Sequence, residues 1–290
     1  MTTTTSGFTI LSAAAGSGKS GLSVGFARIL RSRRLEVQAF KPVSVVNLAD
    51  TTCPEPELWR RGAFYNCNAA DQPVSWWNSP VAVVPSEGGG EGEIYIAGSP
   101  AGEVPIAGAD QIDFSAVSDV VRKQAVEAIE LAFRECARRG DVVLQEGAGG
   151  AGAIAPEADL ANFFASRISQ LPAVLVAKAG KEGHIPALVG SYHIARAAGL
   201  PVAGFILNQV LQDHQLPELR GRVETSTGLT FFGSMPNVGY PTGFDGSLAA
   251  QRALDDHWGE LLLATRTGTN VLLRFGLEQD DRRREVSEAT

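Results

Sequence analysis

A loop of small residues running from Ser12 to Ser20, with the sequence SAAAGSGKS, carries the first side chains that could do chemistry. It follows an apolar segment, Phe8–Leu11, and precedes a segment of helical period. Small side chains let backbone N–H groups turn inward around phosphate oxygens, and the N-terminus of the following helix adds its dipole. We therefore expect Lys19 to reach the β- and γ-phosphates of a nucleotide and Ser20 to ligate Mg²⁺. The predicted cofactor-binding residues of this loop are Ser12, Ala15, Gly16, Ser17, Gly18, Lys19 and Ser20.

An acidic residue, Glu146, ends a second apolar segment that begins at Asp141, and the glycine-rich turn GAGG follows it. Ligands of doubly wound sheets bind at the carboxyl ends of the strands. Glu146 is therefore expected to face the Mg²⁺ held by Ser20, and Gly147 and Gly149 to approach a substrate closely. The alternatives are a solvated carboxylate before a turn, and a strand–helix turn that contains GSGKS by chance, since Ala13 replaces the first glycine of the common G-x-x-x-x-G-K-[ST] pattern.

The elements that must position these residues alternate between short apolar runs and longer segments of helical period. This pattern predicts the α/β class: a doubly wound, mostly parallel sheet resembling P-loop NTPases, with a large insertion after the second strand. The expected strands are Phe8–Leu11, Val37–Phe40, Val142–Gln145, Ala173–Val176, Val202–Leu207 and Thr230–Phe232. The expected helices are Ser20–Arg31, Phe114–Arg139 (apolar at Val117, Val120, Val121, Ala125 and Ile129), Asp159–Ile168, Ile185–Ala198, Leu216–Thr225 and Ala249–Ala264.

Two stretches do not fit the alternation. Residues 43–112 hold many prolines and the pair Trp76-Trp77, which could stack on a planar ligand or belong to a core or subunit interface. Such an insertion is either a functional lid or an interaction surface. The stretch after Gly276 has almost no apolar residues. The sequence thus predicts one synthetase domain over 1–275, with 43–112 as the substrate region, and a flexible tail over 276–290.

Composition narrows the function classes. Lysine and arginine total 25 against 32 acidic residues, giving a formal charge of -7, which argues against a nucleic-acid partner. Three cysteines without a C-x-x-C pair indicate neither a disulfide framework nor a cysteine-rich zinc site. No signal peptide and no long apolar run is present, so a cytoplasmic protein without a membrane partner is expected.

The ordered motifs resemble the dethiobiotin synthetase and cobyric acid synthase superfamily of P-loop ATP-dependent ligases. They are Ser12–Ser20, Lys41-Pro42, Glu146–Gly150, Asp159–Phe163 and Lys181–Gly183, together with Gly204–Asn208. The middle is similar to the synthetase domain of cobyric acid synthase, because KPVSVVNLA from Lys41, Glu57–Arg60 and Asn78–Pro85 resemble its segments.

The resemblance implies roles for named residues. Ser20, Glu57 and Glu146 would hold Mg²⁺, with Asp50 as a second candidate. Lys19 and Lys41 would be catalytic, neutralising the transferring phosphate. Asn208 would read the adenine edge, and Lys181 would contact substrate. The cofactors implied are ATP and Mg²⁺, and the assembly implied is a homodimer.

Several positions depart from the family pattern: Ser12 replaces a glycine, Ala14 an acidic residue and Val84 a lysine. The chain also stops where a glutamine amidotransferase domain would begin, so ammonia, an amine or a separate glutaminase would supply the nitrogen. The implied function is an ATP-dependent ligase that phosphorylates a small-molecule carboxylate or carbamate for amide formation or ring closure. Two alternatives remain: a carboxylating or kinase-like enzyme nearer dethiobiotin synthetase, and a nucleotide-dependent switch or partner subunit with reduced catalysis.

Overall fold

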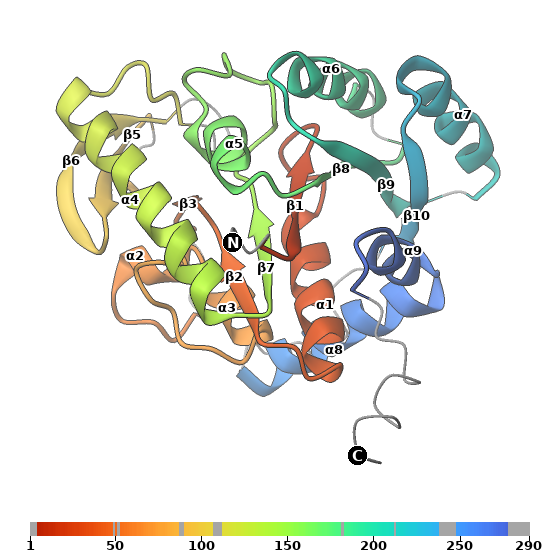
Figure 1. The fold of residues 1–290 in the computed structure, drawn as a ribbon, viewed down its shortest axis with the longest axis horizontal. Helices are drawn as coiled ribbons and strands as arrows, with labels where there is room; N and C mark the ends of the chain where they lie inside the picture. Colours follow the sequence, from red (N-terminus) through yellow and green to blue (C-terminus); the bar gives the residue numbers. More distant parts are fainter. Residues whose placement is uncertain are drawn as a thin grey trace.

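A six-stranded sheet forms the centre of the computed structural model, which describes residues 5–48, 50, 53–86, 90–106, 112–180, 183–211, 213–237 and 248–277. The strand order is β10-β9-β8-β1-β7-β2, and every pairing is parallel (Figure 1). The expectation of a parallel α/β sheet is therefore confirmed. The strands are β1 (Gly7–Ser12), β2 (Val37–Phe40), β7 (Val142–Glu146), β8 (Ala173–Lys178), β9 (Val202–Val210) and β10 (Thr230–Pro236).

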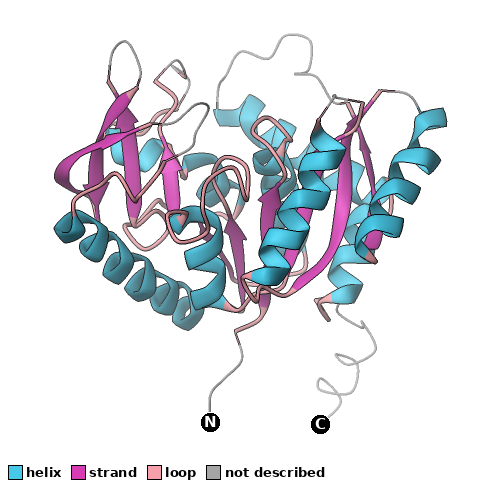
Figure 2. Cartoon of the chain, turned by 90° about the horizontal axis from the view of Figure 1, so that it is seen from above, coloured by secondary structure: helices cyan, strands magenta, loops and turns pink. Residues whose placement is uncertain are grey.

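Helices cover both faces of this sheet (Figure 2). Alternation along β1 explains why: Phe8 and Ile10 pack with Phe26 of one helix layer, whereas Leu11 packs with Leu188 of the other. The first layer contains α1 (Lys19–Ser32), α3 (Phe64–Ala69), α8 (Leu248–Ala264) and α9 (Thr267–Arg274). The second contains α4 (Asp119–Arg139), the π-helix η1 (Leu160–Phe164), α5 (Ala165–Ser169), α6 (His184–Ala197) and α7 (Leu216–Thr227), which the short 3₁₀ turn η2 (Asp213–Gln215) precedes.

The insertion contains a second sheet that the sequence did not predict as a unit. Its order is β3-β4-β5-β6, with β3 parallel to β4 and the other pairs antiparallel. Val83 and Ile94 of this sheet share one apolar cluster with Ile129 of α4 and Val143 of the central sheet. The insertion is thus packed on the same core as the central sheet. Its elements are β3 (Val43–Val45), α2 (Leu58–Arg61), β4 (Val81–Pro85), β5 (Glu91–Ile96) and β6 (Ser99–Pro105), in addition to α3.

Three details correct the expected helices and tail. Helix α4 begins at Asp119, because the Ser118 hydroxyl caps it by accepting a hydrogen bond from Val121 N at 3.4 Å. Val120, placed on the apolar stripe by its spacing, is 68% exposed. Helix α9 was not expected, and it packs Val271 against the core. Leu277 of the predicted tail is buried, while residues 278–290 lie outside the described residues.

Candidate nucleotide and metal site

The loop from Ser12 to Ser20 leaves the carboxyl end of β1 and enters α1 at Gly18, which has a φ of +82°. A side chain at Gly18 would collide with the amide of Asn208 at the end of β9. Only glycine therefore fits both the left-handed conformation and the space available here. The Asn208 Nδ2 donates to Ser17 O at 2.9 Å, so the neighbouring part of the sheet holds the loop in place.

Glu146 lies beside this loop because Ile10 of β1 and Glu146 of β7 are register partners at the same edge of the sheet. The Ser20 hydroxyl donates to Glu146 Oε1 at 2.7 Å, and Lys41 Nζ lies 3.3 Å from the same oxygen. Asn66 Nδ2 donates to the other oxygen, Oε2, at 2.7 Å. The carboxylate is 2% exposed, so four elements converge on one buried charge.

The electrostatics of this cluster keep Glu146 ionised. Burial alone would raise the pKa of its carboxyl, but the charges of Lys41 and Lys19 and the hydrogen bonds from Asn66 and Ser20 lower that pKa to about 2. A permanently charged carboxylate next to a serine hydroxyl is a hard oxygen donor pair of the kind that Mg²⁺ prefers.

Lys19 ties the phosphate loop to the glycine-rich turn after β7. Its Nζ donates to Ser12 Oγ at 2.7 Å and to Gly149 O at 2.8 Å, and Ser12 Oγ donates to the same Gly149 carbonyl at 2.8 Å. The hydroxyl that replaces the family's glycine at position 12 is thus a direct partner of the candidate catalytic lysine.

A buried Asp159–Asn162 pair supports the glycine-rich turn from behind. Asn162 Nδ2 donates to Ala148 O at 2.8 Å and to both Asp159 oxygens, at 3.1 and 2.9 Å. A side chain at Gly147 would collide with Asn162 Oδ1, which explains the glycine there. Burial raises the pKa of Asp159 to about 6 against the hydrogen bonds from Asn162 and the backbone and the charge of Lys19.

The structure brings most of the sequence-predicted site residues together. Residues Ser12–Ser20, Lys41, Glu146, Gly147, Gly149 and Asn208 all border the loop and the turn. Ser17 Oγ donates to Ala14 O at 2.7 Å and lies 3.4 Å from Nδ1 of His184, which is therefore a neighbour of the loop.

Glu57, a predicted Mg²⁺ ligand, is not part of this cluster. Its exposed carboxylate accepts from Trp59 Nε1 at 2.6 Å and lies 3.4 Å from Arg60 Nε. Asp50 accepts from Tyr65 Oη at 2.6 Å. The structure gives neither carboxylate a contact with Ser20 or Glu146, and Lys181 lies outside the described residues.

Trp76 and Trp77 are half-buried and meet edge to face, with ring centroids 6.0 Å apart. The Arg139 guanidinium lies 4.1 Å over the Trp77 ring, and Trp76 packs against the core clusters of both sheets. The pair therefore fills the junction between the two sheets, as the core interpretation expected.

Sequence reasoning missed Asn66 altogether and gave Asn162 no role. The available signal for Asn66 was a pair of asparagines, Asn66 and Asn68, within an otherwise mostly apolar six-residue helix. Buried amides in such a segment need hydrogen-bond partners, and for Asn66 the partner is Glu146.

Two searches of known proteins place these observations in context. A family model described as an AAA domain matches residues 109–242, which include Glu146 and Asn208. Two solved structures share the fold: the cell division ATPase MinD of Pyrococcus furiosus, with 14% identity, a TM-score of 0.50 and 91% of this chain and 98% of that chain covered, and the MinC:MinD complex of Aquifex aeolicus, with 11% identity, a TM-score of 0.51 and 92% and 95% covered. The chain has a P-loop NTPase fold.

Curated relatives are cobyric acid synthases. That of Azorhizobium caulinodans is 30% identical over 229 residues, which cover 78% of this chain and 44% of the relative. That of a Bradyrhizobium species is 29% identical over 223 residues, with 76% and 43% covered. This chain thus spans less than half the length of the curated relatives it matches.

Within the described residues, no helix is long and apolar enough to cross a membrane. The same residues contain no cluster of three or more histidine, cysteine or acidic side chains that could hold a metal ion. Any Mg²⁺ at the Ser20–Glu146 pair would therefore complete its coordination with water and nucleotide phosphates, as is usual for this ion.

Proposed function

We propose that this chain is an ATP-dependent carbon–nitrogen ligase that activates a small-molecule carboxylate by phosphorylation. The observation that carries the proposal is the convergence of Lys19, Ser20, Lys41 and Asn66 around the buried carboxylate of Glu146. The similarity to cobyric acid synthases supports it over most of the chain.

The phosphate loop would bind the nucleotide through its backbone N–H groups, and Ser20 and Glu146 would hold Mg²⁺. When bound, Mg²⁺ would offset charge on the phosphate oxygens. Lys41, already next to Glu146, is placed to neutralise the transferring phosphoryl group, and Lys19 can leave Ser12 and Gly149 for the phosphates. Phosphoryl transfer needs mainly such positioning and charge stabilisation from the protein.

The proposed reaction has two steps. A substrate carboxylate oxygen bonds to the γ-phosphorus as the bond to the leaving ADP oxygen breaks. Ammonia or an amine then attacks the acyl carbon of the mixed anhydride, loses a proton and expels phosphate, which keeps the former carboxylate oxygen. A carbamate formed from CO₂ would react in the same way and would close a ring with an internal amine.

This route predicts transfer of a labelled oxygen from the carboxylate to phosphate. Each member of a panel of heavy-oxygen-labelled carboxylates, including corrinoid acids and diamino acids, would be incubated with MgATP and ammonia, and released phosphate analysed by mass spectrometry. Label in phosphate supports carboxylate activation. Stimulated phosphate release without label overturns it and indicates direct hydrolysis.

A second candidate is a nucleotide-dependent switch, favoured by the bonds that hold Lys19 to Ser12 and Gly149. A switch would bind ATP without substrate-stimulated phosphate release. The predicted homodimer and the separate source of ammonia belong to the ligase proposal, and light scattering of the purified protein with and without MgATP tests the dimer.

A further inference from the structure

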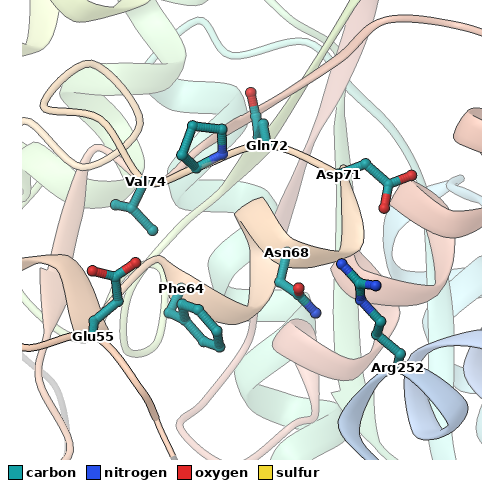
Figure 3. A pocket seen from close by; sticks show the side chains of 8 residues that line it. Glu55, Phe64, Asn68, Asp71, Gln72, Val74 and Arg252 are labelled. Atoms are coloured by element: carbon teal, nitrogen blue, oxygen red, sulfur yellow. The ribbon is translucent and has the colours of Figure 1, made fainter. Parts of the chain in front are cut away.

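A cleft of about 320 Å³ lies on the side of α3 that faces away from Glu146, bordered by the start of α8 (Figure 3). Phe64 and Asn68, one helical turn apart, line it, whereas Asn66 points the other way, to Glu146. Helix α3 therefore separates this cleft from the phosphate site. Its volume is at the small end of the range for ligand pockets, which suits a molecule of amino-acid size.

One end of the cleft carries a cation. Arg252 of α8 reaches toward it, and makes no ion pair with any residue that the structure describes. Asp71, the nearest carboxylate in the view, is held by Arg28 at 3.3 Å and Arg31 at 3.5 Å. The Arg252 guanidinium thus has its planar set of donors available for an anion.

The other end carries an anion. Figure 3 shows Glu55 across the cleft from Arg252, with Phe64 and Asn68 between them. Its closest cationic neighbour among the described residues is Arg60, whose Nη1 lies at a long 3.9 Å from Glu55 Oε2. This side chain is 17% exposed, so its charge is partly desolvated and would attract an ammonium group more strongly than a fully exposed carboxylate would.

Apolar side chains lie between the two charged ends. Phe64 is 9% and Val74 3% exposed, and both border the cleft. Such a surface suits methylene groups, which gain from leaving water.

We propose that this cleft is a second binding site for a small zwitterion whose carboxylate pairs with Arg252 and whose ammonium group pairs with Glu55. A short aliphatic chain joining the two groups would pack on Phe64 and Val74. This ligand chemistry is that of linear ω-amino acids. The site is distinct from the nucleotide site and goes beyond the proposed ligase function.

The test is calorimetric titration of the full chain without nucleotide, using linear ω-amino acids of increasing length from glycine to ε-aminocaproate. We expect one length to bind best, because the charged ends of the cleft are fixed. Alkylamines and alkyl carboxylates of matched length should bind at least about tenfold more weakly, since each lacks one charge-assisted contact. Equal binding of the amine or the carboxylate alone, or no binding across the series, would overturn the proposal.

Variants locate the site. Arg252→Gln and Glu55→Gln should each lower the affinity about tenfold or more, and Arg252→Lys should retain part of it. Arg222→Gln, at an exposed position of α7, is the matched control and should leave affinity unchanged. Unchanged affinity in both cleft variants, with thermal unfolding like that of the unaltered protein, would place the binding elsewhere and refute the assignment. Because no nucleotide is present, the outcome is independent of ATP chemistry.

Discussion

Lys41 Nζ lies 3.3 Å from Glu146 Oε1, the oxygen that also accepts the hydrogen bond from Ser20. The lysine follows β2 and the glutamate ends β7, and these strands are neighbours in the sheet. A fixed ammonium group thus stands where the phosphate loop, the acidic strand end and the insertion meet. The pair links the insertion to the proposed chemistry, because Lys41 immediately precedes Pro42 and β3.

Replacing Lys41 by methionine should reduce MgATP-dependent phosphate release by about 10²- to 10³-fold, the usual effect of losing one aligned charge-stabilising group. It should also lower the free energy of unfolding by about 3 kcal/mol, since Glu146 would be left buried with less compensation. Chemical denaturation and a phosphate assay measure both. Lys123→Met, at an exposed position of α4, is the control and should change neither quantity.

Asn66 is expected to act as a positioning residue for Glu146. Asn66→Ala removes the hydrogen bond to Oε2 and should raise the Mg²⁺ concentration needed for half-maximal activity about tenfold, the usual effect of losing a group that orients a metal ligand. Asn68→Ala, on the opposite side of α3, is the comparison. If both alanine variants show the same Mg²⁺ dependence as the unaltered chain, Asn66 has only a structural role.

Gly18 and Gly16 form a matched pair for testing the phosphate loop. Both have positive φ angles, +82° and +73°, but a Cβ at Gly18 would collide with the Asn208 amide whereas nothing lies within 4 Å of one at Gly16. Gly18→Ala should therefore abolish measurable ATP binding, while Gly16→Ala should cost only the backbone strain of about 1–2 kcal/mol. Fluorescent-nucleotide titration compares them, and equal losses in the two variants would contradict the predicted role of Asn208 contact.

Asp159 should make stability depend on pH between about 4 and 6. Its folded pKa of about 6 lies above the model value of 3.8, so its protonated form is favoured in the fold. The resulting stability is fully present below the unfolded pKa and is lost as pH rises through the folded one. A shift of this size corresponds to about 3 kcal/mol.

Asp159→Asn should flatten this part of the pH profile of the free energy of unfolding, measured by urea denaturation. Asp255→Asn is the necessary comparison, because burial raises the pKa of Asp255 to about 6 as well. A profile that keeps its full slope in the Asp159→Asn variant and loses it entirely in Asp255→Asn would contradict this origin.

The central sheet was predictable because its strands are short apolar runs that alternate with segments of helical period. The second sheet was not: β3 has three residues, and most positions of β6 are exposed, so neither carries a clear pattern. The phosphate loop, Lys41 and Glu146 were found from motifs that follow strand ends. Glu57 and Asn66 differ because their surroundings depend on how the insertion packs, and short helices such as α2 and α3 have no periodicity that fixes this.

The predicted placement of Asn208 at the loop was useful although its side chain lies differently from the expectation. Asn208 is fully buried and donates to Ser17 O, so it acts first on the loop backbone. Its Oδ1 has no hydrogen-bond partner among the described residues and is the acceptor that an adenine amino group would need. Adenine recognition by this residue stays a prediction.

The most direct test of the central claim is phosphate release from MgATP, with ammonia present, across a panel of carboxylates. The unaltered protein would be compared with Lys19→Ala and Glu146→Gln, each checked for folding by circular dichroism. We predict release that one substrate class stimulates and that falls about 10²- to 10³-fold in Lys19→Ala and likewise in Glu146→Gln. Tight ATP binding with no stimulated release by any carboxylate, or normal turnover in Lys19→Ala, would contradict the ligase account.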